Sequence, residues 1–230
     1  MIKKLSLYKK FFKRYGPFII IMMLFSAVVL SSFYFILQPK ITLPIYSPNM
    51  VSSELVEEEI QYIKKYHKIS DFSLTNQNGE TITQDYYENK IYIADFFFTT
   101  CPTICPIMTE NMYQIQEKTI ENNVLLVSYS VTPEIDSVSQ LKKYAIEKGV
   151  KDNKWNLLTG DKKQIYDLAR KSYLVAKNDG DGGKYDMIHT ENFVLIDKEK
   201  RIRGFYDGTS EEEMNKLLID VEILKNSYKK

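Results

Sequence analysis

Two cysteines stand where an apolar run of the sequence ends, and their position constrains the fold more than any other feature. The run Ile91–Phe98 is apolar and rich in aromatic residues, which predicts a buried β-strand. Cys101 and Cys105 follow it, each with a proline directly after it. Apolar residues then recur at helical spacing, at Met108, Met112 and Ile115. The pattern predicts a strand followed by a helix, with both sulfurs at the junction and the methionines in the core.

Cys101 and Cys105 are the only cysteines among the 230 residues, which is too few for a disulfide framework. A bridge between them would close a very short loop and would add little stability through chain entropy. At the start of a helix, residues four apart lie on nearly the same face, and the helix N-terminus favours the thiolate form. The pair therefore suits either a soft metal ion or reversible disulfide chemistry.

Two histidines are the other candidate ligands. His189 directly precedes a predicted strand at residues 191–197, so we expect it near another end of the sheet. A lone histidine is more often a surface residue than a ligand, and the residues alone leave both roles open. His67 lies among lysines in a polar segment, which predicts a solvated side chain. Two thiolates with one neutral imidazole would favour Cu(I), and a looser arrangement would also accept Cu(II).

The N-terminal part of the chain predicts a membrane anchor. Residues 1–16 are basic and hold no acidic residue, and residues 17–37 then run without a charge. A run of this length can cross a bilayer, which takes about 20 apolar residues. The basic flank predicts a cytoplasmic N-terminus and an exported domain. A cleaved signal peptide is the alternative, but the run is longer than a usual signal core and no small-x-small site follows it.

Beyond the anchor we expect a tether and one domain. Residues 38–68 hold Pro39, Pro44 and Pro48 and predict a stiff tether, with a short peripheral helix at 54–68. Residues 69–230 form the predicted domain. Its strands are expected at 69–74, 81–83, 91–98, 123–130, 155–158, 172–176, 191–197 and 201–206. Helices are expected after Pro106, from Asp136 or Ser137 to about Lys148, over 161–171 and from Ser210. Strands alternating with helices predict an α/β fold with a mixed sheet, and sites in such folds gather beyond the strand ends.

The charge balance excludes one class of partner. The chain carries 31 Lys and Arg residues against 30 Asp and Glu residues, which gives a net charge of +1. That balance gives no basis for binding nucleic acid or another polyanion through the whole chain.

The chain resembles the Sco/SenC family of thioredoxin-like copper proteins. The resemblance covers roughly residues 69–224 and rests on five segments in the same order, namely DFSLTNQNG, FFFTTCPTICPIM, VSYSVTPEIDSVSQLKKYA, WNLLTGDKKQIYDLAR and IHTENFVLIDKEKRIRGFYDGT. Two departures change the charge near the site without removing a ligand. Thr103 stands where the family often has Asp, and Thr132 stands before Pro133 where the family often has Asp-Pro.

This resemblance implies a thioredoxin-like mixed sheet flanked by helices, and a membrane-tethered metallochaperone for the dinuclear copper site of cytochrome c oxidase. Cys101, Cys105 and His189 would be the copper ligands, for Cu(I) and also for Cu(II). The partners would be the copper-site subunit of the oxidase, a copper donor and a thiol reductant. The setting would be the inner membrane of a bacterium, with a single span and the domain in the periplasm.

Two alternative functions, both enzymatic, stay open. The first is an enzyme, an extracytoplasmic thiol-disulfide oxidoreductase without copper transfer, and members of the family are also thought to reduce the oxidase's cysteines. Against it, the spacing is one residue longer than Cys-x-x-Cys, and residues 187–193 hold a histidine and no proline. The second is a peroxidase of the peroxiredoxin type, suggested by FTTCPT, which would need an arginine beside Cys101. Arg170 is the candidate for that arginine.

Overall fold

The computed structural model describes residues 2–37, 42–56, 61–62, 67–177, 183 and 186–229. It divides the chain into two compact units, Met1–Ile41 and Thr42–Lys230. The first unit consists of the helix α1 (Ile2–Leu37), and the second holds the sheet and every other helix of the described ranges.

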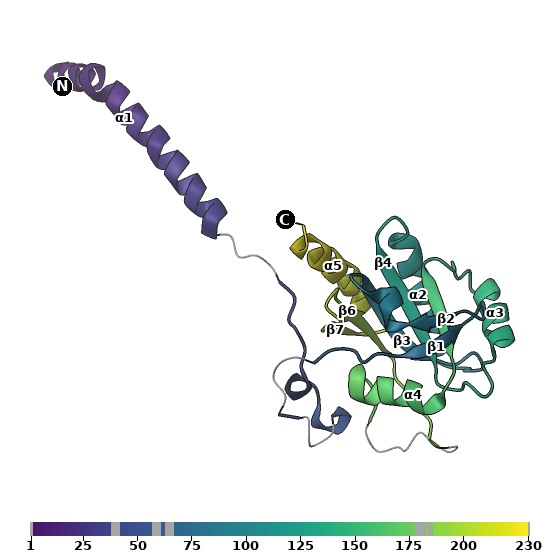
Figure 1. Ribbon diagram of the computed structural model, residues 1–230. Helices are drawn as coiled ribbons and strands as arrows, with labels where there is room; N and C mark the ends of the chain where they lie inside the picture. Colours follow the sequence, from purple (N-terminus) through teal and green to yellow (C-terminus); the bar gives the residue numbers. More distant parts are fainter. Residues whose placement is uncertain are drawn as a thin grey trace. The chain divides into compact units, whose positions relative to one another are not determined.

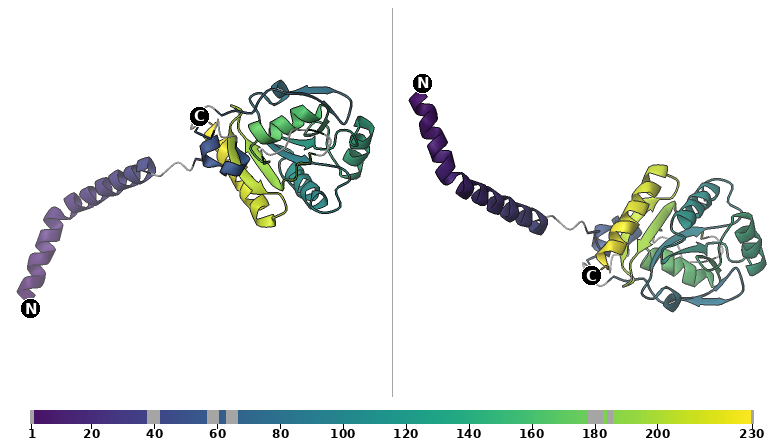
Figure 2. Two further views of the ribbon diagram at one scale, coloured as in Figure 1. Left: turned by 90° about the horizontal axis from the view of Figure 1, so that it is seen from below. Right: turned by 90° about the horizontal axis from the view of Figure 1, so that it is seen from above.

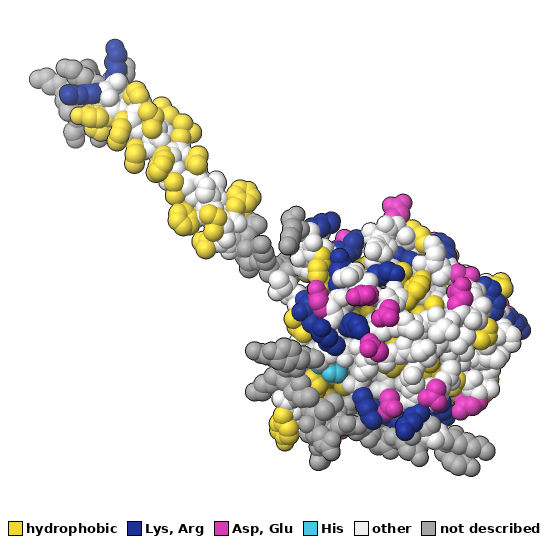
Figure 3. Space-filling model, in the orientation of Figure 1, with side chains coloured by type: hydrophobic (Ala, Val, Ile, Leu, Met, Phe, Trp, Pro, Cys, Tyr) yellow, Lys and Arg dark blue, Asp and Glu magenta, His cyan; other side chains and the backbone are white. Residues whose placement is uncertain are grey.

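α1 has the length and composition of a membrane span. The part from Lys13 to Leu37 is long and apolar enough to cross a bilayer. On the face that Figure 3 shows, hydrophobic side chains predominate along this helix, whereas charges of both signs are interspersed on the second unit. Pro17 lies inside the helix, where it removes one backbone hydrogen bond, and the helix is bent (Figure 2).

The described residues of the second unit form one seven-stranded mixed sheet (Figure 1). Its strands are β1 (Ser73–Asn76), β2 (Thr81–Thr83), β3 (Ile91–Phe97), β4 (Val124–Ser130), β5 (Trp155–Thr159), β6 (Asn192–Ile196) and β7 (Ile202–Asp207). They lie in the order β2-β1-β5-β4-β3-β6-β7. β4 runs parallel to both β3 and β5, and the other neighbours pair antiparallel. The predicted α/β fold with a mixed sheet is confirmed.

Helices cover both faces of the sheet, and each face has its own hydrophobic cluster. One cluster holds apolar residues of α2 (Cys105–Lys118), α3 (Val138–Glu147) and α5 (Glu211–Ser227). The other holds apolar residues of α4 (Lys162–Asp167) and of the π-helical turn η4 (Leu168–Ser172) that continues it. β3 and β4 are buried along their whole length, because both of their faces are covered.

The ends of two helices follow the sequence prediction. Ser137 caps α3, since its hydroxyl accepts a hydrogen bond from the N–H of Gln140, and Ser210 caps α5 in the same way. Asp136, the other residue expected to cap α3, does not cap it, because its carboxylate turns inward and is fully buried.

The strand expected at 172–176 is wrong. The helical turn η4 ends at Ser172, and residues 173–176 close its C-terminus instead of pairing as a strand. The N–H of Tyr173 donates to the carbonyl of Leu168 and that of Val175 to the carbonyl of Ala169, with Leu174 at a φ of 56°. Its apolar side chains are buried, but a short apolar run does not by itself distinguish a strand from a buried helix end. The expected helix at 54–68 lies largely outside the described residues, which show a short 3-10 turn at Ser53–Leu55.

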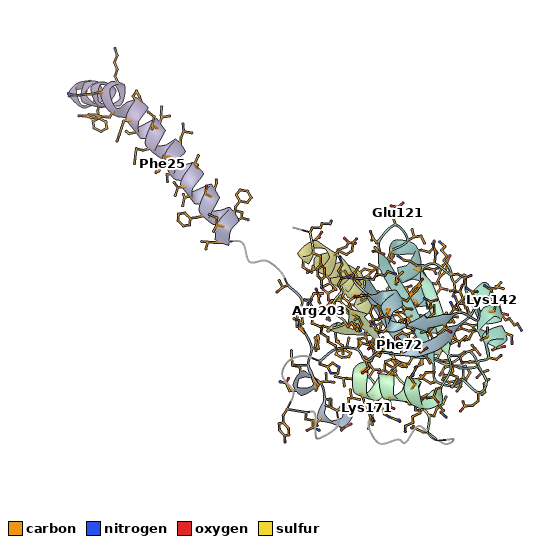
Figure 4. The ribbon with its side chains drawn as sticks, viewed as in Figure 1. Phe25, Phe72, Glu121, Lys142, Lys171 and Arg203 are labelled. Atoms are coloured by element: carbon orange, nitrogen blue, oxygen red, sulfur yellow. The ribbon has the colours of Figure 1, made fainter. Side chains whose placement is uncertain are left out.

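Residues 42–48 lie along β7, and we call this segment the strap. Arg203 holds it, because its guanidinium donates to the carbonyl of Pro44 at 2.8 Å and to that of Leu43 at 2.6 Å. The N–H of Tyr46 donates to a carbonyl of β7 at 2.9 Å. Arg203, labelled in Figure 4, is itself buried. It forms an ion pair with Asp197 at 3.0 Å. The strap is therefore part of the second unit.

Candidate metal centre

Both cysteines lie where β3 gives way to α2. β3 ends at Phe97, Cys101 lies in the following loop, and Cys105 is the first residue of α2. The cysteines are not bridged, and they are only 8% and 4% exposed. The N–H of Cys105 donates to the sulfur of Cys101 at 3.5 Å, and the hydroxyl of Thr103 lies 3.6 Å from the same sulfur. The predicted position of the pair at a strand–helix junction is confirmed.

The surroundings give the two thiols different pKa values. Burial acts to raise the pKa of Cys101, but hydrogen bonds from the backbone N–H groups of Thr103 and Cys105 outweigh it and lower that pKa to about 7. Burial raises the pKa of Cys105 to about 12, and the charge on Cys101 adds to the effect. Near pH 7, Cys101 is therefore a thiolate in about half of the reduced chains, whereas Cys105 is a protonated thiol.

A buried carboxylate fixes the loop that carries Cys101. Asp136 accepts hydrogen bonds from the backbone N–H and the hydroxyl of Thr99, two residues before the cysteine, at 3.2 and 2.5 Å. Its second oxygen also accepts from the hydroxyls of Ser130 and Thr132 at 2.6 and 3.1 Å. Gln140 of α3 donates to the Thr99 hydroxyl at 3.1 Å. The loops that follow β3 and β4 are thus joined through one side chain.

His189 lies near the same end of the sheet. β6 runs antiparallel to β3, so the residues just before β6 approach the carboxyl end of β3. The imidazole of His189 is exposed, and its ring centre lies 6.1 Å from that of Phe98, the residue after β3, in an edge-to-face arrangement. Over the part of the chain that the structure describes, no three His, Cys, Asp or Glu side chains form a group that could hold a metal. The cysteines are brought together, and His189 is placed close to their loop without joining them.

Arg170, the candidate for polarising a peroxide, is engaged elsewhere. Its guanidinium donates to the carboxylate of Asp186 at 2.7 Å and to the carbonyl of Lys177 at 2.8 Å. Through these contacts Arg170 holds the chain at Lys177 and at Asp186, and most of the residues between them lie outside the described ranges.

His67, predicted to be solvated, is solvated only in part. Its side chain is partly buried, and its Nε2–H donates to the carbonyl of Ser172 at 2.7 Å. The neighbouring backbone binds the same residue, since the N–H of Ser70 donates to the Ser172 hydroxyl. The polar composition around His67 conceals this contact, because the partner is 105 residues away in the sequence.

Asp95 is a buried acid that the sequence analysis missed. It lies in β3, only 2% of it is exposed, and its Oδ1 has no hydrogen-bond partner. Burial raises its pKa to about 7, and a hydrogen bond with Ser128 of β4 acts against that rise. Its negative charge also adds to the raised pKa of Cys105. The signal was available, since one acid inside the apolar run IYIADFFF is unexpected in a buried strand.

The predictions for the methionines and the two departures have clear outcomes. Met108 and Met112 are fully buried in the core under α2, as expected. Thr103 places its hydroxyl beside the sulfur of Cys101, and Thr132 donates to Asp136. Both departures therefore bring an uncharged hydroxyl to the region of the cysteine loop.

Comparison with protein families gives a match to the SCO1/SenC model over residues 60–221. A curated relative, the SCO1 protein homolog of Bacillus subtilis, is 32% identical over 161 residues, which is 68% of this chain and 82% of that protein. The family match covers the predicted domain from residue 69 to residue 221, a range that includes both cysteines and His189.

Solved structures show the same fold. One is BsSco, described as a member of the Sco family of cytochrome c oxidase assembly proteins with a disulfide switch. It has a TM-score of 0.60 and 30% identity, and covers 71% of this chain and 95% of its own. Another is the copper-bound ScoI of Arabidopsis thaliana, with a TM-score of 0.53 and 26% identity, covering 66% of this chain and 97% of its own.

Proposed function

This chain belongs to the SCO1/SenC family, and on that premise we propose that it is a membrane-anchored copper metallochaperone. It binds copper through Cys101, Cys105 and His189 and serves the assembly of cytochrome c oxidase. Copper is the cargo of the protein rather than a resident cofactor.

One observation carries the proposal, namely the unbridged cysteine pair at the first turn of α2. Soft sulfur ligands select Cu(I), and two of them at a helix N-terminus can bind one ion together. A copper-bound structure of a relative supports the choice of metal. His189 supports the choice of a third ligand, because it stands beside Phe98, three residues before Cys101.

The chain's own residues prepare the site for the metal. Asp136 holds the loop through Thr99, so that Cys101 faces the start of α2. His189 is exposed and is therefore the ligand that a recipient can most easily displace. Transfer then proceeds by exchange of ligands, with the sulfurs releasing the metal last. A disulfide between the cysteines would block loading, so a thiol reductant must keep the pair open.

The partners follow from the family and from the anchor. The recipient is the copper-site subunit of cytochrome c oxidase, in line with the described role of BsSco in oxidase assembly, and a separate donor supplies the metal. α1 supplies a single membrane anchor with the basic N-terminus in the cytoplasm and the second unit outside it. The chain would thus meet its recipient at the inner membrane of a bacterium.

The test is a titration of the reduced full chain, in detergent micelles, with Cu(I) against a competing chelator. We expect one tightly bound ion per chain, loss of that binding in the Cys101→Ser/Cys105→Ser variant, and weaker retention in His189→Ala. Absence of tight binding by the reduced wild-type chain would overturn the proposal. Unchanged retention by His189→Ala would remove His189 from the ligand set.

A second candidate function is thiol-disulfide reduction of the recipient's cysteines. The observation in its favour is the contact between the N–H of Cys105 and the sulfur of Cys101, which holds two free thiols close to each other. The disulfide switch described for BsSco supports the same chemistry. Here the pair would be oxidised to a disulfide as it reduces the disulfide of the recipient. A reduction potential above that of the recipient's pair would exclude this direction of electron flow.

A further inference from the structure

A single buried arginine joins the two sides of a loop. Arg170 lies in the π-helical turn η4, and its side chain is 6% exposed. Its Nε–H donates to the carbonyl of Lys177, and its Nη2–H donates to the carboxylate of Asp186. The chain therefore leaves this guanidinium at residue 177 and comes back to it at residue 186.

Asp186 is held by a second group as well. Its side chain is 9% exposed, so the ion pair with Arg170 is shielded from water. The hydroxyl of Tyr166 donates to the backbone carbonyl of Asp186 at 3.0 Å and also lies 3.0 Å from the carbonyl of Val131, just after β4. The Arg170 guanidinium stacks over the Tyr166 ring at 5.3 Å. The side chain of Asp186 is thus fixed to η4 and its backbone to α4.

The fixed residue lies three positions before His189. Ile188, between them, is buried in the hydrophobic cluster under α4, and Thr190 on the other side is also buried. The backbone around His189 is therefore held on both sides, while the imidazole itself is exposed against Phe98. A displacement of Asp186 would therefore shift the backbone of the next two residues and, with it, the imidazole of His189.

We propose that the buried ion pair of Arg170 and Asp186 is a positioning device that sets the location of His189 relative to the cysteine loop. This inference rests on the proposed function, in which His189 is a copper ligand. Within the described residues Arg170 contacts neither cysteine, so it acts through Asp186.

A buried ion pair calls for an explanation of this kind. The desolvation of two charges offsets much of their attraction, so such a pair is weak support for stability by itself. Arginine suits the position because its rigid fork can bind a carboxylate and a carbonyl at the same time, which a lysine cannot do with fixed directions. Arg170 fixes the positions of Lys177 and Asp186. A metal ligand that follows such a segment needs its backbone held in one position.

The first experiment is metal-free. In the reduced full chain in detergent micelles, NMR would record NOE cross-peaks between the ring protons of His189 and those of Phe98. The chain has two histidines, so a His67→Gln variant assigns the signals. We expect the cross-peaks to disappear in Asp186→Asn and in Arg170→Lys. Their persistence in both variants would overturn the proposal.

The matched control is Arg203→Lys. Arg203 is also buried, at 8% exposure, and paired with a fully buried carboxylate, but it holds the strap instead of the His189 segment. We expect the His189–Phe98 cross-peaks to remain in this variant. Their loss would show that any buried ion pair affects His189 equally, and the positioning role of Arg170 would fall.

The second experiment separates positioning from general damage. Cu(I) affinity would be compared for Asp186→Asn in the wild-type background and in the His189→Ala background. We expect a loss of about tenfold in the first, as is usual for residues that orient a ligand, and no further loss in the second. Equal losses in both backgrounds would show that Asp186 does not act through His189. If the wild-type chain bound no copper, the proposed function would fail while the NMR result still decided the positioning.

Discussion

The two cysteines are chemically unequal although they belong to one short motif. Cys101 has donors around its sulfur and a pKa lowered to about 7, whereas Cys105 is deeper and its pKa is raised to about 12. The pKa values differ because the two cysteines lie four residues apart, one before the helix and one inside it. Cys101 precedes α2 and accepts hydrogen bonds from the backbone N–H groups of Thr103 and Cys105, whereas Cys105 is the first residue of α2 and belongs to the core cluster.

Alkylation of the reduced chain should show this inequality. The rate for Cys101 should rise with pH and level off above a midpoint of about 7, because only the thiolate reacts. Cys105 should stay unmodified at pH 8, where on the order of 1 molecule in 10⁴ carries its thiolate. Mass spectrometry of peptides after a short exposure to iodoacetamide measures both. Equal labelling of the two cysteines at pH 8 would contradict the assignment.

Asp95 makes a separate prediction about stability and pH. Its pKa is about 7 in the folded chain, above the ordinary value of 3.8, so folding favours the protonated form. Its contribution to stability is fully present below pH 4 and is lost as the pH rises through 7. The variant Asp95→Asn stays neutral throughout.

We therefore expect Asp95→Asn to match the wild type at pH 4 and to exceed it at pH 8. The gain in the free energy of unfolding should be at most on the order of 4 kcal/mol, from about 3 pKa units at 1.36 kcal/mol each. Urea unfolding of residues 42–230, which hold both hydrophobic clusters, measures it at the two pH values. A difference that does not change with pH would show that Asp95 does not titrate in this range.

At the scale of elements, the neighbouring residues Asp136 and Ser137 have different roles at the point where the loops after β3 and β4 meet. Ser137 caps α3 at the surface, whereas Asp136 joins the loop after β3 to the loop after β4. The sequence predicts either residue as the cap, because both types are favoured at helix N-termini. Only the fold assigns the cap to one and the buried junction to the other.

Alanine substitutions should separate these roles. Ser137→Ala should lower the free energy of unfolding by about 1 kcal/mol, the usual cost of a lost cap. Asp136→Ala should cost about 3 kcal/mol or more, because several buried donors lose their acceptor at once. Urea unfolding of residues 42–230 at pH 7 compares the two. Similar costs for both variants would show that the junction does not depend on Asp136.

Elements whose sequence signals lie close together in the chain could be predicted, whereas contacts between residues far apart in the chain could not. The strand–helix junction at the cysteines, the hairpin of β6 and β7 and the cap at Ser210 follow from residues close together in the sequence. The bonds of Thr99 with Asp136 and of Arg170 with Asp186 join residues 37 and 16 positions apart. These bonds form only when the fold brings the two segments together, and no local sequence pattern identifies either partner.

At the scale of the whole molecule, the strap joins the region after α1 to the far edge of the sheet. Arg203 holds it through the carbonyls of Leu43 and Pro44. The variant Arg203→Met keeps the length of the side chain and removes these bonds. We expect faster hydrogen–deuterium exchange in peptides covering residues 42–48, above all at the Tyr46 N–H, with no change in β3. Exchange that is unchanged over 42–48 would mean that Arg203 does not hold the strap.

Because the strap belongs to the second unit, only the few residues before it limit the distance between that unit and α1. Only residues 38–41 stand between the end of α1 at Leu37 and the start of the second unit at Thr42. Even a fully extended chain of that length covers about 18 Å. With α1 in a bilayer, as proposed, the unit would be confined to a thin layer above the lipid. Its encounters with a recipient would then be collisions between neighbours diffusing laterally in one plane, set by their surface density instead of by their concentration in solution.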